Sequence, residues 1–194
     1  MPKLVVLTAP SGAGKTTIVH ALLQARRDLS FSVSATTRSR RPTESDGVDY
    51  HFLSKEEFRS LIDQDAFLEW EEVYQDQFYG TLHREVQACW NAGRHVIFDI
   101  DVKGAQRIKQ AYPDKTLTVF VKPPSLEVLR ERLQKRESET PESIRKRLEK
   151  ASFELSFENF FDIVLVNDNL EATLREATDI VNRWLDDQQM SPPA

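Results

Sequence analysis

Residues 9–17 bring together the residue types that bind a polyphosphate in proteins. In order they are Ala9, Pro10, Ser11, Gly12, Ala13, Gly14, Lys15, Thr16 and Thr17. Glycines allow a tight turn and a close approach of the backbone, so that successive N–H groups point into one concavity. In such a loop the lysine reaches the β- and γ-phosphates of a nucleotide, and the hydroxyl that follows it binds Mg²⁺. The segment therefore predicts the binding of a nucleoside triphosphate with magnesium, through Lys15 and Thr16.

The residues on either side of this loop predict the elements that position it. Residues 4–7 are apolar and indicate a strand that is buried on both faces. Beyond Lys15, apolar residues recur at helical spacing, at Ile18, Val19 and Leu22. A strand, a glycine-rich turn and a helix in this order are the context of a P-loop, in which the helix N-terminus adds partial positive charge. The usual first glycine of the motif is Ala9 here, so a strand–turn–helix that binds no phosphate is the alternative.

Two aspartates lie at the carboxyl end of another strongly apolar strand, which we predict over residues 95–99. Asp99 ends this strand, and an acid in that place beside a P-loop is expected to hold Mg²⁺ through water. Asp101, two residues further on, is expected to face the same way. The alternative for Asp99 is that it caps the helix that follows.

Arginines are concentrated in two parts of the chain, both of which suit phosphate binding. The first group is Arg38, Arg40 and Arg41, and the second is Arg132, Arg136 and Arg147, on either side of the polar segment 137–140. Guanidinium groups bind phosphate oxygens in a bidentate manner, so these groups suggest a second phosphorylated substrate and a lid over the transferring phosphate. A solvated loop, and a helical face whose arginines pair with local glutamates, are the alternatives.

Strands alternate with helices along most of the chain, which predicts an α/β fold with a parallel sheet and helices on both faces. Residues 29–34 are one of the expected strands, and Ser125 is expected to start a helix that runs to about Arg136. We expect a core over residues 1–34 and 83–194, a helical lid at about residues 130–148, and an insertion with its own small sheet over residues 35–82. Ligands bind at the carboxyl ends of parallel strands, where the P-loop, Asp99 and Asn167 are expected to meet.

Composition narrows the functional classes. The chain of 194 residues has a net charge of −5, which argues against non-specific nucleic-acid binding. The single cysteine, Cys89, excludes a disulfide framework, and the four histidines are scattered rather than set at ligand spacing. No apolar run approaches the ~20 residues of a membrane span, and no signal peptide precedes the first strand. We therefore expect a cytoplasmic protein without a membrane partner, and its oligomeric state stays open.

Taken in order, the motifs resemble those of the guanylate kinase family over nearly the whole chain. The matching segments are the P-loop, residues 31–38 (FSVSATTR), Arg41, and residues 47–50 (GVDY), 67–70 (FLEW), 79–81 (YGT), 99–104 (DIDVKG), 123–125 (PPS), 132–136 (RLQKR) and 166–168 (VND). The departures are Ala9, where the family usually has glycine, and Thr81, where some members have serine. The resemblance implies a P-loop core, a GMP-binding insertion and a lid, and the Mg²⁺-dependent, in-line transfer of a phosphoryl group from ATP to GMP.

The same resemblance implies roles for individual residues. The GMP phosphate is assigned to Arg38, Arg41, Tyr50 and Tyr79, and the guanine base to Ser34, Glu69, Thr81 and Asp101. The ATP phosphates are assigned to Lys15 and the lid arginines Arg132, Arg136 and Arg147, and adenine lies near Asn167. The alternative for Glu69 is an exposed place on its strand, within the acidic run formed with Glu71 and Glu72.

Two other functions compete with this interpretation. Scaffold proteins contain guanylate kinase-like domains that bind phosphopeptides, but those domains usually lack the P-loop lysine that is present here as Lys15. A kinase for another nucleoside monophosphate would keep the core but would not need a carboxylate at Glu69.

Overall fold

A five-stranded parallel sheet forms the centre of the molecule in the computed structural model, which describes residues 1–135 and 140–187, Tyr74 by its backbone only. The strand order is β2-β7-β1-β8-β9. The bounds are Leu29–Phe31 for β2, His95–Asp99 for β7, Leu4–Thr8 for β1, Thr116–Lys122 for β8 and Ile163–Val166 for β9. All neighbouring pairs are parallel, with Leu4 opposite Val96 on one side and Thr116 on the other. The predicted α/β fold is confirmed.

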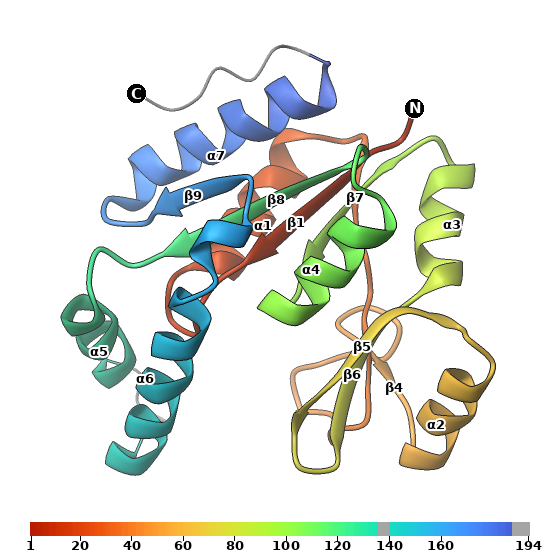
Figure 1. Cartoon of the computed structure of the whole chain (residues 1–194), viewed down its shortest axis with the longest axis horizontal. Coiled ribbons are helices and arrows are strands. Elements are labelled where there is room, and N and C mark those ends of the chain that lie inside the picture. Colours follow the sequence, from red (N-terminus) through yellow and green to blue (C-terminus); the bar gives the residue numbers. More distant parts are fainter. Residues whose placement is uncertain (136–139, 188–194) are drawn as a thin grey trace.

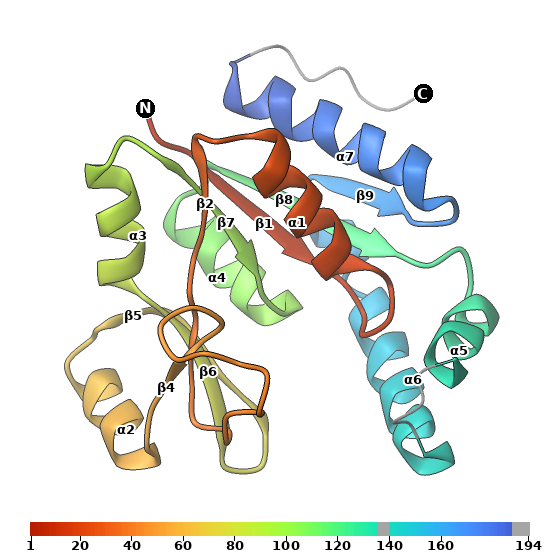
Figure 2. The ribbon, with the colours of Figure 1, turned by 180° about the vertical axis from the view of Figure 1, so that it is seen from behind.

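Strand β1 separates two apolar cores, because successive side chains of a strand point to opposite faces. Val5 and Leu7 belong to the core beneath helices α1 (Lys15–Ala25) and α7 (Leu170–Leu185). Leu4 and Val6 belong to the core beneath α3 (His83–Asn91) and α4 (Val102–Ala111). Figure 1 is seen from the α3 and α4 side, and Figure 2 from the α1 side. The prediction that this strand is buried on both faces is confirmed.

A second, mixed sheet is built from residues that lie between 35 and 82. Its order is β4 (His51–Phe52), β3 (Ala35–Thr36), β6 (Gln77–Leu82) and β5 (Phe67–Tyr74). Strands β3 and β4 are parallel, whereas β6 is antiparallel to both β3 and β5. Helix α2 (Lys55–Asp63) covers this sheet and begins with a capping box formed by Ser54 and Glu57.

Helices α5 (Leu126–Gln134) and α6 (Pro141–Leu155) form a pair that packs through Leu129, Leu133, Ile144 and Ala151. Thr140 caps α6 and Pro141 is its first residue, and the short 3₁₀ helix η1 (Glu158–Phe160) follows it. In both views this pair and the second sheet extend from the same end of the central sheet (Figures 1 and 2). The polar segment between the two helices falls mostly on residues 136–139, outside the described part of the chain.

Two predicted boundaries are wrong. Strand β2 ends at Phe31 rather than at residue 34, because after Ser32, whose N–H donates to the carbonyl of Ile97 at 3.0 Å, the chain leaves the central sheet. Three residues later Ala35 pairs with Gly80 in the second sheet. Helix α5 ends at Gln134 rather than near residue 136. Within the described residues, none of the helices has the length and apolarity needed to cross a membrane. The cytoplasmic location stays a prediction.

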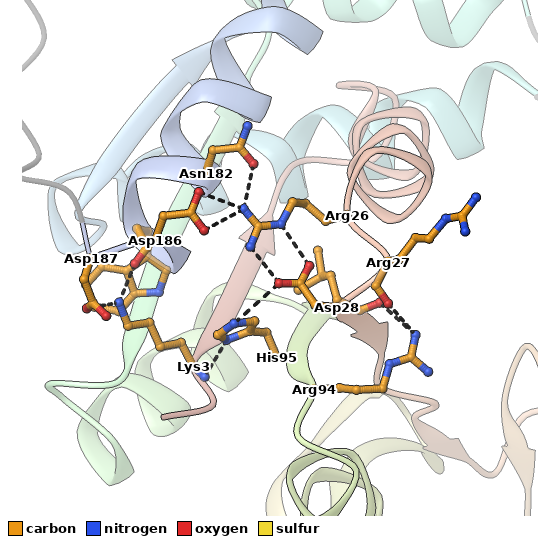
Figure 3. Close-up of polar contacts among 11 residues, drawn as sticks. Lys3, Arg26, Arg27, Asp28, Arg94, His95, Asn182, Asp186 and Asp187 are labelled. Carbon is orange, nitrogen blue, oxygen red and sulfur yellow. Dashed lines mark hydrogen bonds and ion pairs between the residues drawn. The ribbon is translucent and has the colours of Figure 1, made fainter.

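Charged side chains gather at the amino ends of the central strands (Figure 3). Arg26, which follows α1, donates to both carboxylate oxygens of Asp28, at 2.9 and 2.7 Å, and to Asp186 at the end of α7, at 2.9 and 3.1 Å. The N–H of Lys3 donates to Nδ1 of His95 at 2.9 Å, and the Lys3 ammonium pairs with Asp187. These contacts tie α1 and α7 to the first residues of the sheet.

Candidate active site

A cavity of about 610 Å³ lies at the carboxyl ends of the central strands. Three parts of the chain line it: the P-loop with the end of β7, the second sheet, and helix α6. From the predicted site it includes Ala9, Pro10, Ser11, Gly12, Gly14, Lys15, Thr16, Thr17, Ser34, Arg41, Tyr50, Glu69, Tyr79, Asp99, Asp101 and Arg147. The fold therefore brings together the residues that the sequence assigns to two different phosphorylated ligands.

The P-loop has the conformation that its glycines permit. Gly12 and Gly14 have φ angles of 96° and 97°, in a region that other residues rarely adopt. Gly14 precedes α1 and makes no side-chain cap, so the first N–H groups of the helix are left for an anion. The methyl group of Ala9 belongs to the apolar core around Val5 and Leu7. Ala9, which stands where the motif usually has its first glycine, therefore contributes to the packing of the core.

Lys15 and Asp99 form an ion pair inside the cavity, with 2.5 Å between Nζ and Oδ1. The Lys15 ammonium also donates to the carbonyl oxygen of Ile100 at 3.3 Å. The same carbonyl accepts a hydrogen bond from the hydroxyl of Thr8 at 3.1 Å, which ties the ends of β1 and β7 together. Asp99 therefore does not cap α4. That cap is Asp101, whose side chain accepts from the N–H of Gly104 at 2.8 Å.

Asn167 follows β9 and lies beneath the P-loop rather than in the open cavity. Its side chain is only 4% exposed, and its amide donates to the carbonyl oxygen of Ala13 at 2.7 Å. A Cβ atom on Gly14 would lie 2.3 Å from the same amide nitrogen. Asn167 thus supports the shape of the loop, and its predicted place near adenine stays a prediction.

Glu69 lies on β5 and is 6% exposed, so the exposed alternative for this residue is wrong. Its Oε1 accepts a hydrogen bond from the hydroxyl of Thr81 on β6 at 2.6 Å. Burial raises the pKa of the Glu69 carboxyl from 4.5 to about 7, and the nearby charge of Asp101 adds to this effect. A buried carboxylate with a single donor partner among the described residues has acceptor capacity left for a ligand.

The residues predicted to bind the acceptor phosphate lie in the loop between β3 and β4 and on β6. Arg41, Tyr50 and Tyr79 line the cavity, and the rings of Tyr50 and Tyr79 meet edge to face with centroids 6.0 Å apart. The guanidinium of Arg38 lies over the Tyr50 ring, 5.0 Å from its centroid. It donates to both oxygens of Glu44, each at 2.7 Å, and this pairing lowers the pKa of Glu44 to about 2.

The lid arginines lie in different places. Arg147 on α6 lines the cavity and donates to the hydroxyl of Ser11 at 2.5 Å. Arg132 on α5 donates instead to the backbone carbonyl of Asn167 at 2.8 Å. Arg136 lies outside the described residues. The packing of α5 against the P-loop is close, because a Cβ atom on Gly12 would lie 3.0 Å from the side chain of Leu133.

Sequence reasoning missed several residues of the site. Lys146, Lys150 and Glu154 line the cavity beside Arg147. The spacing of residues 147, 150 and 154 places them on one face of a helix, which is a signal that the sequence contains. Glu44 was missed as the partner of Arg38. Gly104 lies in the matching segment 99–104, but its closeness to Glu69, 35 positions away, is not indicated by that local pattern.

Comparisons with known proteins identify the family of the chain. The family model described as guanylate kinase matches residues 1–184. A guanylate kinase of Salinibacter ruber is 52% identical over 182 residues, which are 94% of this chain and 96% of that protein. A guanylate kinase of Bacteroides thetaiotaomicron is 47% identical over 94% of this chain and 90% of that protein. The crystal structure of guanylate kinase from Anaplasma phagocytophilum matches with a TM-score of 0.77 and 29% identity, over 98% of this chain and 88% of that one.

Proposed function

The chain belongs to the guanylate kinase family and catalyses the ATP-dependent phosphorylation of GMP to GDP, and we propose how its residues divide this work. One observation carries the proposal. A buried carboxylate, Glu69, faces the same cavity as the P-loop lysine, Lys15. The cavity therefore has a group suited to reading a base and a group suited to holding a triphosphate.

Glu69 recognises guanine by accepting two hydrogen bonds. The Watson–Crick edge of guanine presents the N1–H and the 2-amino group side by side, and an ionised carboxylate offers two acceptors at a matching separation. The hydroxyl of Thr81 donates to one carboxylate oxygen, and Asp101 and Ser34 line the same cavity. Adenine has an acceptor at N1 and no 2-amino group, so AMP would leave a desolvated carboxylate unpaired. Sites of this kind can reject the wrong ligand by ~10⁴ or more.

Lys15 and Arg147 stabilise the charge of the transferring phosphoryl group, with Arg132 and Arg136 proposed to assist from the lid. An oxygen of the GMP phosphate attacks the γ-phosphorus of ATP in line, the bond to the β,γ-bridging oxygen breaks, and ADP leaves. No covalent intermediate with the enzyme is needed, because positioning and charge stabilisation provide the catalysis. Arg38, Arg41, Tyr50 and Tyr79 hold the attacking phosphate. The ion pair of Asp99 keeps the Lys15 ammonium beside the P-loop.

Mg²⁺ is the proposed cofactor, with Thr16 and Asp99 as the residues that would hold it. Both line the cavity, and a hydroxyl and a carboxylate are hard oxygen donors of the kind that Mg²⁺ prefers. When bound, the ion supplies neutralisation of phosphate charge. Such sites usually take one or two protein ligands beside phosphate oxygens and water, which agrees with this small donor set.

A side-by-side assay of ADP release tests the base assignment. With ATP present, GMP should support a rate far above those of AMP, UMP and CMP, because only guanine offers two adjacent donors to Glu69. Equal rates with AMP and GMP would contradict the proposed role of Glu69. A phosphopeptide-binding module would release no ADP with any of the four nucleotides.

A further inference from the structure

Gly104 lies in the first turn of α4, directly against the carboxylate of Glu69. A Cβ atom added at Gly104 would lie 2.8 Å from Oε2 of Glu69, 3.3 Å from its Cδ atom and 3.3 Å from Cδ1 of Ile100. Real Cβ atoms essentially never approach another heavy atom as closely as 2.8 Å. The absence of a side chain at this position is therefore what leaves room for the carboxylate.

Backbone conformation does not explain the glycine. The positive-φ glycines are Gly12, Gly14, Gly47 and Gly93, and Gly104 is not among them. It lies at an ordinary helical position, where alanine would favour the helix more than glycine does. Glycine therefore weakens α4 at this position, and a methyl group here would collide with the Glu69 carboxylate. We infer that the space needed by this carboxylate explains the glycine.

Hydrogen bonds fix the Glu69 carboxylate and the two elements that bring it next to Gly104. Thr81 on β6 holds Oε1 at 2.6 Å. Strand β5 is fastened to α4 because Glu71 accepts from Lys103 at 2.6 Å and from Arg107 at 3.1 Å. The N–H of Gly104 itself donates to Asp101, the second acid of the proposed base site, at 2.8 Å. Gly104 thus lies against both carboxylates of that site. Its N–H donates to Asp101, and its lack of a side chain leaves room for Glu69.

We propose that Gly104 is a specificity-determining residue of this kinase, which positions the Glu69 carboxylate for guanine by leaving it the space of a methyl group. The proposal rests on the proposed role of Glu69. The atom that a methyl group would meet is the far end of a side chain, so the fold is retained while the carboxylate moves. Both acceptor oxygens are then displaced from the guanine edge. A misplacement of about 1 Å in such a site can lower the rate by up to ~10²-fold.

The test is Gly104→Ala, with Lys103→Ala as the matched control. The control removes a contact between α4 and β5 without placing an atom next to Glu69. In Gly104→Ala the KM for GMP should rise roughly ten- to a hundredfold and the preference for GMP over AMP should narrow. The KM for ATP should stay within about twofold, since the P-loop is untouched. An unchanged KM for GMP would overturn the proposal, as would an equal rise in Lys103→Ala.

Thermal unfolding separates this role from a merely structural one. The unfolding temperature of Gly104→Ala should respond to an ATP analogue as the parent does and respond less to GMP. Equal loss of both responses would show general damage and would overturn the proposal. The double variant Gly104→Ala/Glu69→Gln should discriminate GMP from AMP no worse than Glu69→Gln alone, because Gly104 acts through the carboxylate. Additive losses would contradict this.

The same series distinguishes failure of the inference from failure of its premise. If Glu69→Gln keeps the full preference for GMP, Glu69 does not read the base and the premise is wrong. If Glu69→Gln loses that preference while Gly104→Ala keeps it, the premise stands and the role of Gly104 is wrong.

Discussion

The two ends of the central sheet carry polar networks that differ in how completely their charges are paired. At the amino ends, Arg26 gives both oxygens of Asp28 a hydrogen bond, and this bonding lowers the pKa of Asp28 (Figure 3). At the carboxyl ends, burial raises the pKa of Glu69 to about 7, and burial also raises the pKa of Glu154. Hydrogen bonding therefore stabilises the ionised form of Asp28 at one end, whereas burial penalises the ionised forms of Glu69 and Glu154 at the other.

The difference separates structural charges from ligand-binding charges. A paired, hydrogen-bonded carboxylate contributes to the fold, whereas a buried carboxylate with spare acceptors costs stability until a ligand supplies the donors. Glu69 is the clearest example of the second kind. Groups of this kind collect in binding sites, where the protein accepts lower stability in exchange for specificity.

The largest expected effect comes from Lys15→Ala at the cavity end. The variant should fold, but its kcat should be about 10²–10³-fold lower, because the charge of the transferring phosphoryl group loses a preorganised partner. Rates of ADP release with saturating ATP and GMP measure this. Lys3→Ala, which removes a charge at the opposite end, should keep the parental kcat. Comparable turnover in Lys15→Ala and the parent would remove Lys15 from the proposed mechanism.

Glu69→Gln should lower kcat/KM for GMP by roughly ten- to a hundredfold, as expected for the loss of a hydrogen bond to a charged group. The KM for ATP should change little and the ratio of GMP to AMP activity should fall. The control is Glu72→Gln on the same strand, an exposed position whose carboxylate accepts from the N–H of Asp76 at 2.7 Å. A parental GMP to AMP ratio in Glu69→Gln would contradict base reading by this residue.

The KM for GMP should depend on pH through Glu69. Its pKa is raised from 4.5 to about 7, so the folded protein keeps a proton there that the unfolded chain releases. The contribution of this group to the free energy of unfolding therefore rises as pH falls from about 7 toward 4.5, and guanine binding, which needs the ionised form, weakens over the same window. Below pH 7 the KM should rise by up to about tenfold per pH unit.

The GMP phosphate also titrates near pH 6, so the pH profile needs a reference. Glu69→Gln supplies it, because this variant keeps the phosphate but lacks the carboxyl. The KM for GMP should rise more steeply with falling pH in the parent than in Glu69→Gln. Identical profiles in the two proteins would assign the pH dependence to the substrate.

The smallest expected effect on activity comes from Arg26→Ala at the amino ends. Removing this guanidinium leaves Asp28 and Asp186 without their shared partner, and the free energy of unfolding should fall by about 1–2 kcal/mol. Denaturant unfolding measures the change. The kcat of the folded variant should match that of the parent. A selective loss of GMP binding would contradict the assignment of the charges at the amino ends to stability alone.

The sequence by itself determined the features that depend on neighbours along the chain. The P-loop follows from the order of a strand, glycines and a helix. Alternation of strands and helices predicted the parallel sheet, and its interruption predicted the second sheet. Hydrogen bonds and periodicity over a few residues are enough to encode these elements, so they can be recognised before any packing is known.

Only the tertiary structure decided which distant side chains meet. It placed Glu69 between Thr81 and Gly104, Asn167 beneath Gly14, and Arg132 on the carbonyl of Asn167 rather than in the cavity. It also placed the methyl group of Ala9 in the apolar core. Such contacts depend on how whole elements pack and on gaps as small as one methyl group, and no local pattern of residues records a distance of that kind.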